Sequence, residues 1–162
     1  MGAVTCGSGR WGAPLFAGRP GSGTIGAVPD SPNPAELSAA QLAEHAWQRL
    51  RAEAAALELP WAAAYRQLIE AAHAEPALRA LYPFTSHWAL RFSTTTGPAM
   101  SVVGPVLSVD GDGVFEVGTG IVVPNLGRFA TAREAVACAV RELPPDLGPV
   151  TPGTPLRPWA DG

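Results

Sequence analysis

The ten residues HWALRFSTTT, at positions 87–96, mark the point where the sequence changes from helical to strand character. Apolar and polar residues alternate through the first part of this stretch, with Trp88, Leu90 and Phe92 on one side. A period of two is typical of a β-strand with one buried face. The stretch therefore predicts a strand that begins at His87 and places Trp88, Leu90 and Phe92 in the core.

Apolar residues upstream of this strand recur at helical spacing instead. The pattern predicts a first helix over about 35–59, with Asn33 as its N-cap and Pro34 at its first position. A second helix is predicted over about 61–74, and Pro76 then opens a short helical turn. The second helix has the clearest apolar face, which is formed by Trp61, Tyr65, Leu68, Ile69 and Ala72.

Short apolar runs downstream of the strand are separated by turn signals and predict further strands. Pro105 in the first of these runs indicates an edge strand or a bulge. Phe115 and Val117 alternate with polar residues and are expected to face the core. The predicted strands lie within 100–109, at 114–117, at 121–123 and at 127–129, with a DGDG turn at 110–113.

A final helix is predicted from a complete capping box. Thr131 is the expected N-cap and Glu134 the residue that reaches back to it. Cys138 is expected on the outer face of this helix, between two glutamates. The expected buried face consists of Val136, Ala139, Val140 and Leu143.

Gly- and Pro-rich ends bound the part of the chain that can fold. The sequence has 162 residues, among them 18 Gly and 17 Pro. Residues 1–33 and 150–162 have this composition without apolar periodicity, so we expect a disordered leader and a flexible tail. Residues 34–149 are expected to form one α+β domain, in which N-terminal helices pack on a small antiparallel sheet of 3–5 strands that a C-terminal helix follows.

Composition and motif spacing argue against several classes of partner. The net charge is −3, all basic residues are arginine, and no apolar stretch could span a membrane, so neither nucleic acid nor a membrane is expected. The glycine-rich stretches at 7–12 and 21–26 lack the strand and helix that flank a phosphate loop, so no cofactor is predicted. The histidines have no metal-ligand spacing, and His45 and His73 are expected at the surface. Two cysteines without a disulfide framework favour the cytoplasm.

The polar side of the strand that begins at His87 is the strongest candidate for a binding site. A guanidinium, an imidazole and hydroxyl groups on one side of a strand would suit an anionic ligand. The alternative is a solvated polar face on which Arg91 pairs with Glu116. The candidate residues are Ser86, His87, Arg91 and Ser93.

The stretch ALRALYPFTSHWALRFSTTTG, residues 77–97, also carries a family resemblance. Together with GVFEV (113–117), TAREAVACAV (131–140) and LPPDLGP (143–149), it resembles an actinobacterial family of unknown function whose members are described as natural product biosynthesis proteins. The resemblance covers about residues 46–154. It implies a setting in secondary metabolism, and it implies neither catalytic residues nor a cofactor.

Three functional hypotheses follow from these observations. The first is a small cytoplasmic accessory protein that binds a partner protein, a peptide or a small anionic ligand. The second is an enzyme of secondary metabolism with its site on the face of His87 and Arg91. The third is a purely structural or interaction role. Spacing alone places no Asp, Glu or Cys beside His87, so binding is favoured over catalysis.

Overall fold

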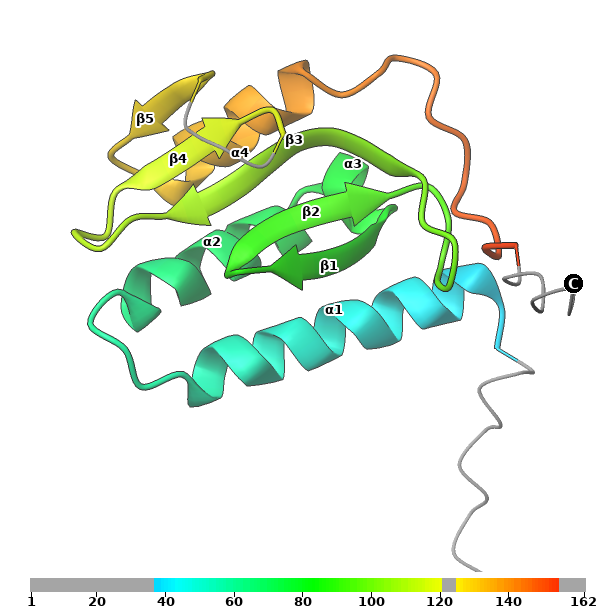
Figure 1. The fold of residues 1–162 in the computed structure, drawn as a ribbon, viewed down its shortest axis with the longest axis horizontal. Coiled ribbons are helices and arrows are strands. Elements are labelled where there is room, and N and C mark those ends of the chain that lie inside the picture. The colour runs from blue at the N-terminus through cyan, green and yellow to red at the C-terminus, as the bar shows by residue number, and fades with distance from the viewer. Residues whose placement is uncertain (1–36, 121–124, 155–162) are drawn as a thin grey trace, which may run out of the picture. The chain divides into compact units, whose positions relative to one another are not determined.

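The computed structural model describes residues 37–120 and 125–154 (Figure 1). The predicted leader, the strand candidate at 121–123 and most of the predicted tail lie outside the described residues. Within the described ranges, no helix combines the length and the apolar character that a membrane span requires. The elements are α1 (Ala39–Ala56), α2 (Ala62–Ala74), α3 (Pro76–Arg79), β1 (Tyr82–Ser86), β2 (Ala89–Ser93), β3 (Val102–Val109), β4 (Phe115–Gly118), β5 (Gly127–Phe129) and α4 (Ala132–Arg141).

The described strands form one antiparallel sheet in the order β1-β2-β3-β4-β5, so each strand pairs with the next along the chain. The longer helices lie on one side of this sheet, with α1 against β1, α2 against β3, and α4 against β3, β4 and β5 (Figure 1). This arrangement confirms the predicted α+β class, with helices first, then an antiparallel sheet, then a C-terminal helix.

The core lies between the helices and the inner face of the sheet. The register places Leu90, Leu107 and Val117 in one row across β2, β3 and β4, and all three side chains are fully buried. Phe92 and Phe115 are buried on the same face, as the sequence predicted for them and for Val117. The apolar face predicted for α2 is confirmed at Tyr65, Leu68, Ile69 and Ala72, which are buried, whereas Trp61 is the N-cap of the helix and is only partly buried.

The prediction that a strand begins at His87 is wrong, because the chain forms a hairpin turn there. β1 ends at Ser86, β2 begins at Ala89, and His87 and Trp88 form the turn between them. Both turn residues have positive φ angles, 52° and 64°, as two-residue hairpin turns require. Trp88 is therefore not in the core but 48% exposed, since the alternation that buries Leu90 stops at the turn. Neither turn residue is the Gly, Asn or Asp that usually marks such a turn in a sequence.

The start of α1 also differs from the prediction. Its N-cap is Ser38, whose Oγ accepts the backbone N–H of Gln41 at 3.3 Å, while the Gln41 side chain accepts the N–H of Ser38 at 2.9 Å. This reciprocal capping box satisfies two N–H groups that a helix start leaves free. The predicted N-cap Asn33 and the adjacent Pro34 lie outside the described residues, and α1 begins at Ala39 rather than at about residue 35. His45 of α1 is exposed, as predicted.

The start of α4 was predicted correctly, but one of its faces was not. Thr131 and Glu134 form the expected capping box. Cys138 is buried rather than on the outer face. The reason is that α4 packs against α2 as well as against three strands, so it buries a wider face than its apolar residues indicated.

A bulge in β3 lies beside the C-terminal end of α4. The register between β2 and β3 shifts between Leu90 and Phe92, and Gly104 and Pro105 of β3 lie opposite this shift. Pro105 was expected to mark such a bulge or an edge. Gly104 has a φ of 69°, and a Cβ atom there would lie 2.6 Å from Cδ2 of Leu143. Glycine is therefore favoured by the backbone conformation, and a larger residue would also displace the end of the Leu143 side chain.

Replacing this glycine should destabilise the fold. We expect Gly104→Ala to lower the free energy of unfolding by about 1–2 kcal/mol, because a side chain strains the left-handed conformation. Gly111→Ala is the matched control, since a Cβ at Gly111 would meet no atom within 4 Å. Urea unfolding of both variants measures the difference. Equal losses in the two variants would contradict the role of the bulge.

Candidate functional site

A depression of about 460 Å³ opens on the sheet face opposite the helices. Ala89 and Arg91 point to this outer face because they alternate with the buried Leu90 and Phe92. We refer to this depression as the Arg91 pocket. Its lining contains the candidate residues Ser86, His87 and Arg91, together with Ala89 and Ser108.

Arg91 supplies a partly buried cation to the pocket. Its Nη2 donates a hydrogen bond of 2.9 Å to the carbonyl of Gly120, which holds the guanidinium in place. Its Nε is buried and has no hydrogen-bond partner among the described residues. A buried donor without an acceptor is unfavourable, so Arg91 has an N–H group whose hydrogen-bonding capacity the described residues leave unused.

The alternative pairing of Arg91 with Glu116 is not present in the described part of the chain. Glu116 instead contacts Arg128, with 3.3 Å between Oε1 and Nε, and Arg128 also pairs with Asp110. Glu116 is thus compensated by a neighbour on its own side of the sheet. Among the described residues that line the Arg91 pocket none is acidic, and Arg91 supplies a positive charge.

The hairpin turn places His87 at the edge of the pocket. Nδ1 of His87 lies 3.2 Å from Oγ of Ser86, which is hydrogen-bond distance, and both residues are exposed. Positive φ angles at His87 and Trp88 cost about 1–2 kcal/mol each, and such strain is typical of functional positions. Within the described residues no carboxylate bonds to the imidazole, so the arrangement is not a catalytic triad.

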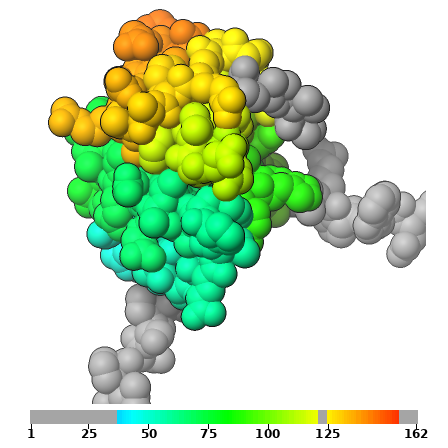
Figure 2. Space-filling view, turned by 90° about the vertical axis from the view of Figure 1, so that its left-hand side faces the viewer, coloured from blue at the N-terminus to red at the C-terminus, as the bar shows by residue number. Residues whose placement is uncertain are grey.

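Aromatic contacts hold the turn from the helical side. The ring centroid of Trp88 lies 5.7 Å from that of Trp61 and 6.0 Å from that of Tyr65, with interplanar angles of 67° and 86° that correspond to edge-to-face contacts. Figure 2 looks onto this end of the molecule, where the α1–α2 connection and the β3–β4 turn also lie. Burial, with a contribution from the charge of Glu53, raises the pKa of Tyr65 to about 12. Tyr65 is therefore a neutral packing partner at physiological pH.

Ser93, the fourth candidate residue, does not line the pocket. It is fully buried, and its hydroxyl lies 2.7 Å from the carbonyl of Thr95 and 3.0 Å from that of Ser101. The Thr95 hydroxyl donates to the carbonyl of Ala99 and accepts from the N–H of Ser101, both at 2.8 Å. These hydroxyl groups satisfy the backbone of the β2–β3 loop, so their role in this structure is to fold that loop.

The same loop binds the last described residues of the chain. The N–H of Thr96 donates to the carbonyl of Thr151, and the N–H of Thr151 donates to the carbonyl of Thr94, both at 3.0 Å. The N–H of Gly153 donates to Oγ1 of Thr96 at 3.3 Å. The C-terminal segment is thus joined to the loop that follows β2.

Residues 41–154 match a protein family described as a family of unknown function, DUF6193. The chain belongs to the DUF6193 family. The expectation that it resembles a family of unknown function is thereby confirmed, and the matched range contains the Arg91 pocket and the hairpin turn. No curated protein and no solved structure was found to match the chain.

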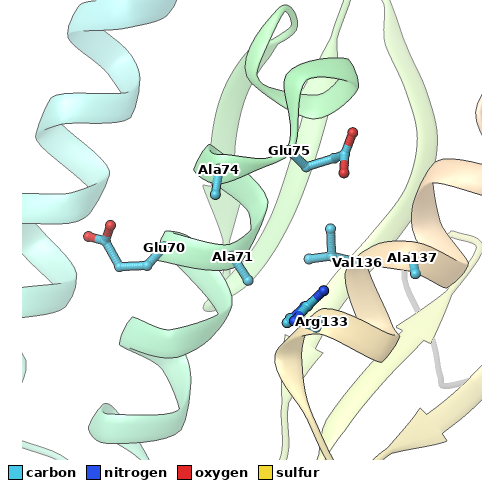
Figure 3. A pocket seen from close by; sticks show the side chains of 7 residues that line it. All are labelled: Glu70, Ala71, Ala74, Glu75, Arg133, Val136 and Ala137. Carbon is cyan, nitrogen blue, oxygen red and sulfur yellow. The ribbon is translucent and has the colours of Figure 1, made fainter.

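The DUF6193 domain has a second depression, of about 530 Å³, between α2 and α4 (Figure 3). Glu70 points away from it toward α1, where it pairs with Arg51 at 2.8 Å. Glu75 accepts the backbone N–H of Ala77 at 3.4 Å. Its other lining residues are Ala71, Ala74, Arg133, Val136 and Ala137. Within the described residues none of these side chains has a buried polar atom without a partner, so this depression is a weaker candidate than the Arg91 pocket.

His73, which was expected at the surface, is a residue of α2 and is largely buried where α2 packs against α1. Its side chain is 15% exposed, its ring centroid lies 5.5 Å from that of Trp47, and its Nε2 has no hydrogen-bond partner among the described residues. Burial lowers the pKa of His73, and the positive charges of Arg51 and Arg79 act in the same direction. The carboxylate of Glu44, 3.9 Å from Nε2, only partly opposes this effect.

The lowered pKa of His73 predicts a loss of stability in mild acid. Below about pH 6.5 the unfolded chain takes up a proton at His73 that the folded protein resists. The free energy of unfolding should therefore fall as the pH falls from about 6.5 through the folded pKa. His73→Leu should flatten this part of the profile in urea unfolding from about pH 5 to 8, and His45→Leu controls for the removal of a histidine. Parallel profiles for the wild type and His73→Leu would refute the assignment.

Proposed function

We propose that this DUF6193 member is a small cytoplasmic accessory protein of natural-product biosynthesis that binds an anionic small molecule in the Arg91 pocket. The observation that carries the proposal is the buried Nε of Arg91, which lies beside an open depression and has no hydrogen-bond partner in the described part of the chain. The setting in secondary metabolism rests on the resemblance carried by residues 77–97. The free thiol of Cys138 is consistent with the proposed cytoplasmic location, because free thiols persist in a reducing compartment.

The groups around the pocket suit a carboxylate or a phosphate. The planar guanidinium of Arg91 can direct two N–H groups at two oxygen atoms of one ligand. The hydroxyls of Ser86 and Ser108 and the imidazole of His87 can donate further hydrogen bonds from the two ends of the lining. A volume of about 460 Å³ falls within the range of small-molecule sites.

The charge distribution favours an anion over a cation. As far as the structure describes it, the pocket lining contains a guanidinium and no carboxylate, and the nearby Glu116 is compensated by Arg128. An anion entering this site would therefore meet one partly desolvated positive charge without a competing negative one. Charge-assisted hydrogen bonds of this kind are roughly twice as strong as neutral ones.

One observation favours the alternative, an enzyme of secondary metabolism on the same face. The distance of 3.2 Å between Ser86 Oγ and His87 Nδ1 would allow the imidazole to activate the hydroxyl. A fluorophosphonate probe should then label the protein, and Ser86→Ala should remove the label. We expect no labelling, because no carboxylate among the described residues orients His87.

Binding of inorganic phosphate and of acetate, followed by NMR at constant ionic strength, tests the proposal. We expect a saturable shift of the Arg91 Nε–H signal in the wild type. Arg91→Gln should weaken binding roughly tenfold or more, the effect of losing hydrogen bonds to a charged group. Arg66→Gln removes the same charge from an exposed position on α2 and should leave the affinity unchanged.

Equal affinity in the wild type and Arg91→Gln would show that the pocket is not the site. A carboxylate presented by a protein partner has the same chemistry as a free one. Titration with a short acidic peptide therefore distinguishes these sources, because a peptide partner should bind much more tightly than acetate.

A further inference from the structure

The His87–Trp88 turn connects the two faces of the sheet. His87 lines the Arg91 pocket on the outer face, while the ring of Trp88 contacts Trp61 and Tyr65 on the side of α2. Tyr65 is 3% exposed and belongs to the core, so it provides a fixed surface for the Trp88 ring. A contact in the helical layer is thus one peptide bond away from a residue of the pocket.

The conformation of this turn is not explained by chain reversal alone. Both φ angles are positive, and a sequence such as Asn-Gly would make the same turn with less strain. Trp88 remains 48% exposed, so burial of its ring does not explain its presence either. The contacts of Trp88 with Trp61 and Tyr65 do have one specific effect, because they fix the orientation of the turn relative to α2.

We propose that Trp88 is a positioning residue for the anion site. Held by Trp61 and Tyr65, it fixes the turn and so keeps the His87 imidazole beside Ser86 at the edge of the Arg91 pocket. Preorganisation of this kind lowers the entropy that a ligand must remove on binding. The effect on affinity rests on the proposed anion-binding function, whereas the effect on the His87 ring does not.

Trp88→Gly separates positioning from folding. Glycine accepts the positive φ at this position, so the hairpin and the fold should persist while the ring contacts disappear. We expect phosphate affinity to fall about fivefold, as for the loss of one hydrogen bond. In the ligand-free protein, the NMR contact between the His87 ring and Ser86 should weaken and the ring should become more mobile. Trp88→Phe, which retains an aromatic ring, should restore most of both properties.

A double-mutant cycle with His87→Ala provides the decisive comparison. If Trp88 acts through His87, Trp88→Gly should cause no further loss of phosphate affinity when His87 is already alanine. Additive losses, or wild-type affinity in Trp88→Gly, would overturn the proposal. If the wild type binds no phosphate, the proposed function fails, and the positioning role is then judged from the His87 ring alone. An equally ordered His87 ring in Trp88→Gly would refute it.

Discussion

The indole of Trp47 joins the helical layer to the sheet. The ring is fully buried, and its N–H donates to the carbonyl of Arg79, at the end of α3, at 3.1 Å. It also packs against His73 of α2 and Phe92 of β2, at centroid distances of 5.5 and 6.2 Å. Because a buried indole N–H needs an acceptor, Trp47 determines the position of α3 as well as the packing of the layers. Phe92 in turn is the neighbour of Arg91, so the same contact helps to set the strand that carries the outer pocket.

Most elements of the fold can be predicted from local sequence patterns. The predictions that were wrong concern residues whose burial or position depends on contacts with distant parts of the chain. The extent of α2, the capping box at Thr131 and the inward positions of Phe115 and Val117 depend on neighbouring residues only, so the sequence predicts them. The turn at Trp88 carries no turn residue, and the rings that Trp88 contacts, those of Trp61 and Tyr65, belong to a distant part of the sequence. Burial of Cys138 similarly depends on which elements surround α4.

The site was accessible to sequence reasoning only in part. Alternation places Arg91 on the outer face, and Ser86 reaches the same face because it pairs with Ala89 across a two-residue turn. Ser93 follows the same alternation, yet it is buried because β2 ends there and the next loop folds over its hydroxyl. The carbonyl of Gly120, which holds Arg91, is far along the chain, and no local pattern indicates it.

The pairing of consecutive strands has a consequence for how the chain acquires its structure. Each hairpin closes a short loop, which costs little chain entropy, so the sheet can form progressively from β1 to β5. The bond between Gly153 and Thr96 is different, since it joins residues 57 positions apart. During synthesis on the ribosome, the β2–β3 loop must wait for this distant segment to emerge. The loop between β2 and β3, although it lies near the middle of the sequence, is therefore among the last parts of the domain to be completed.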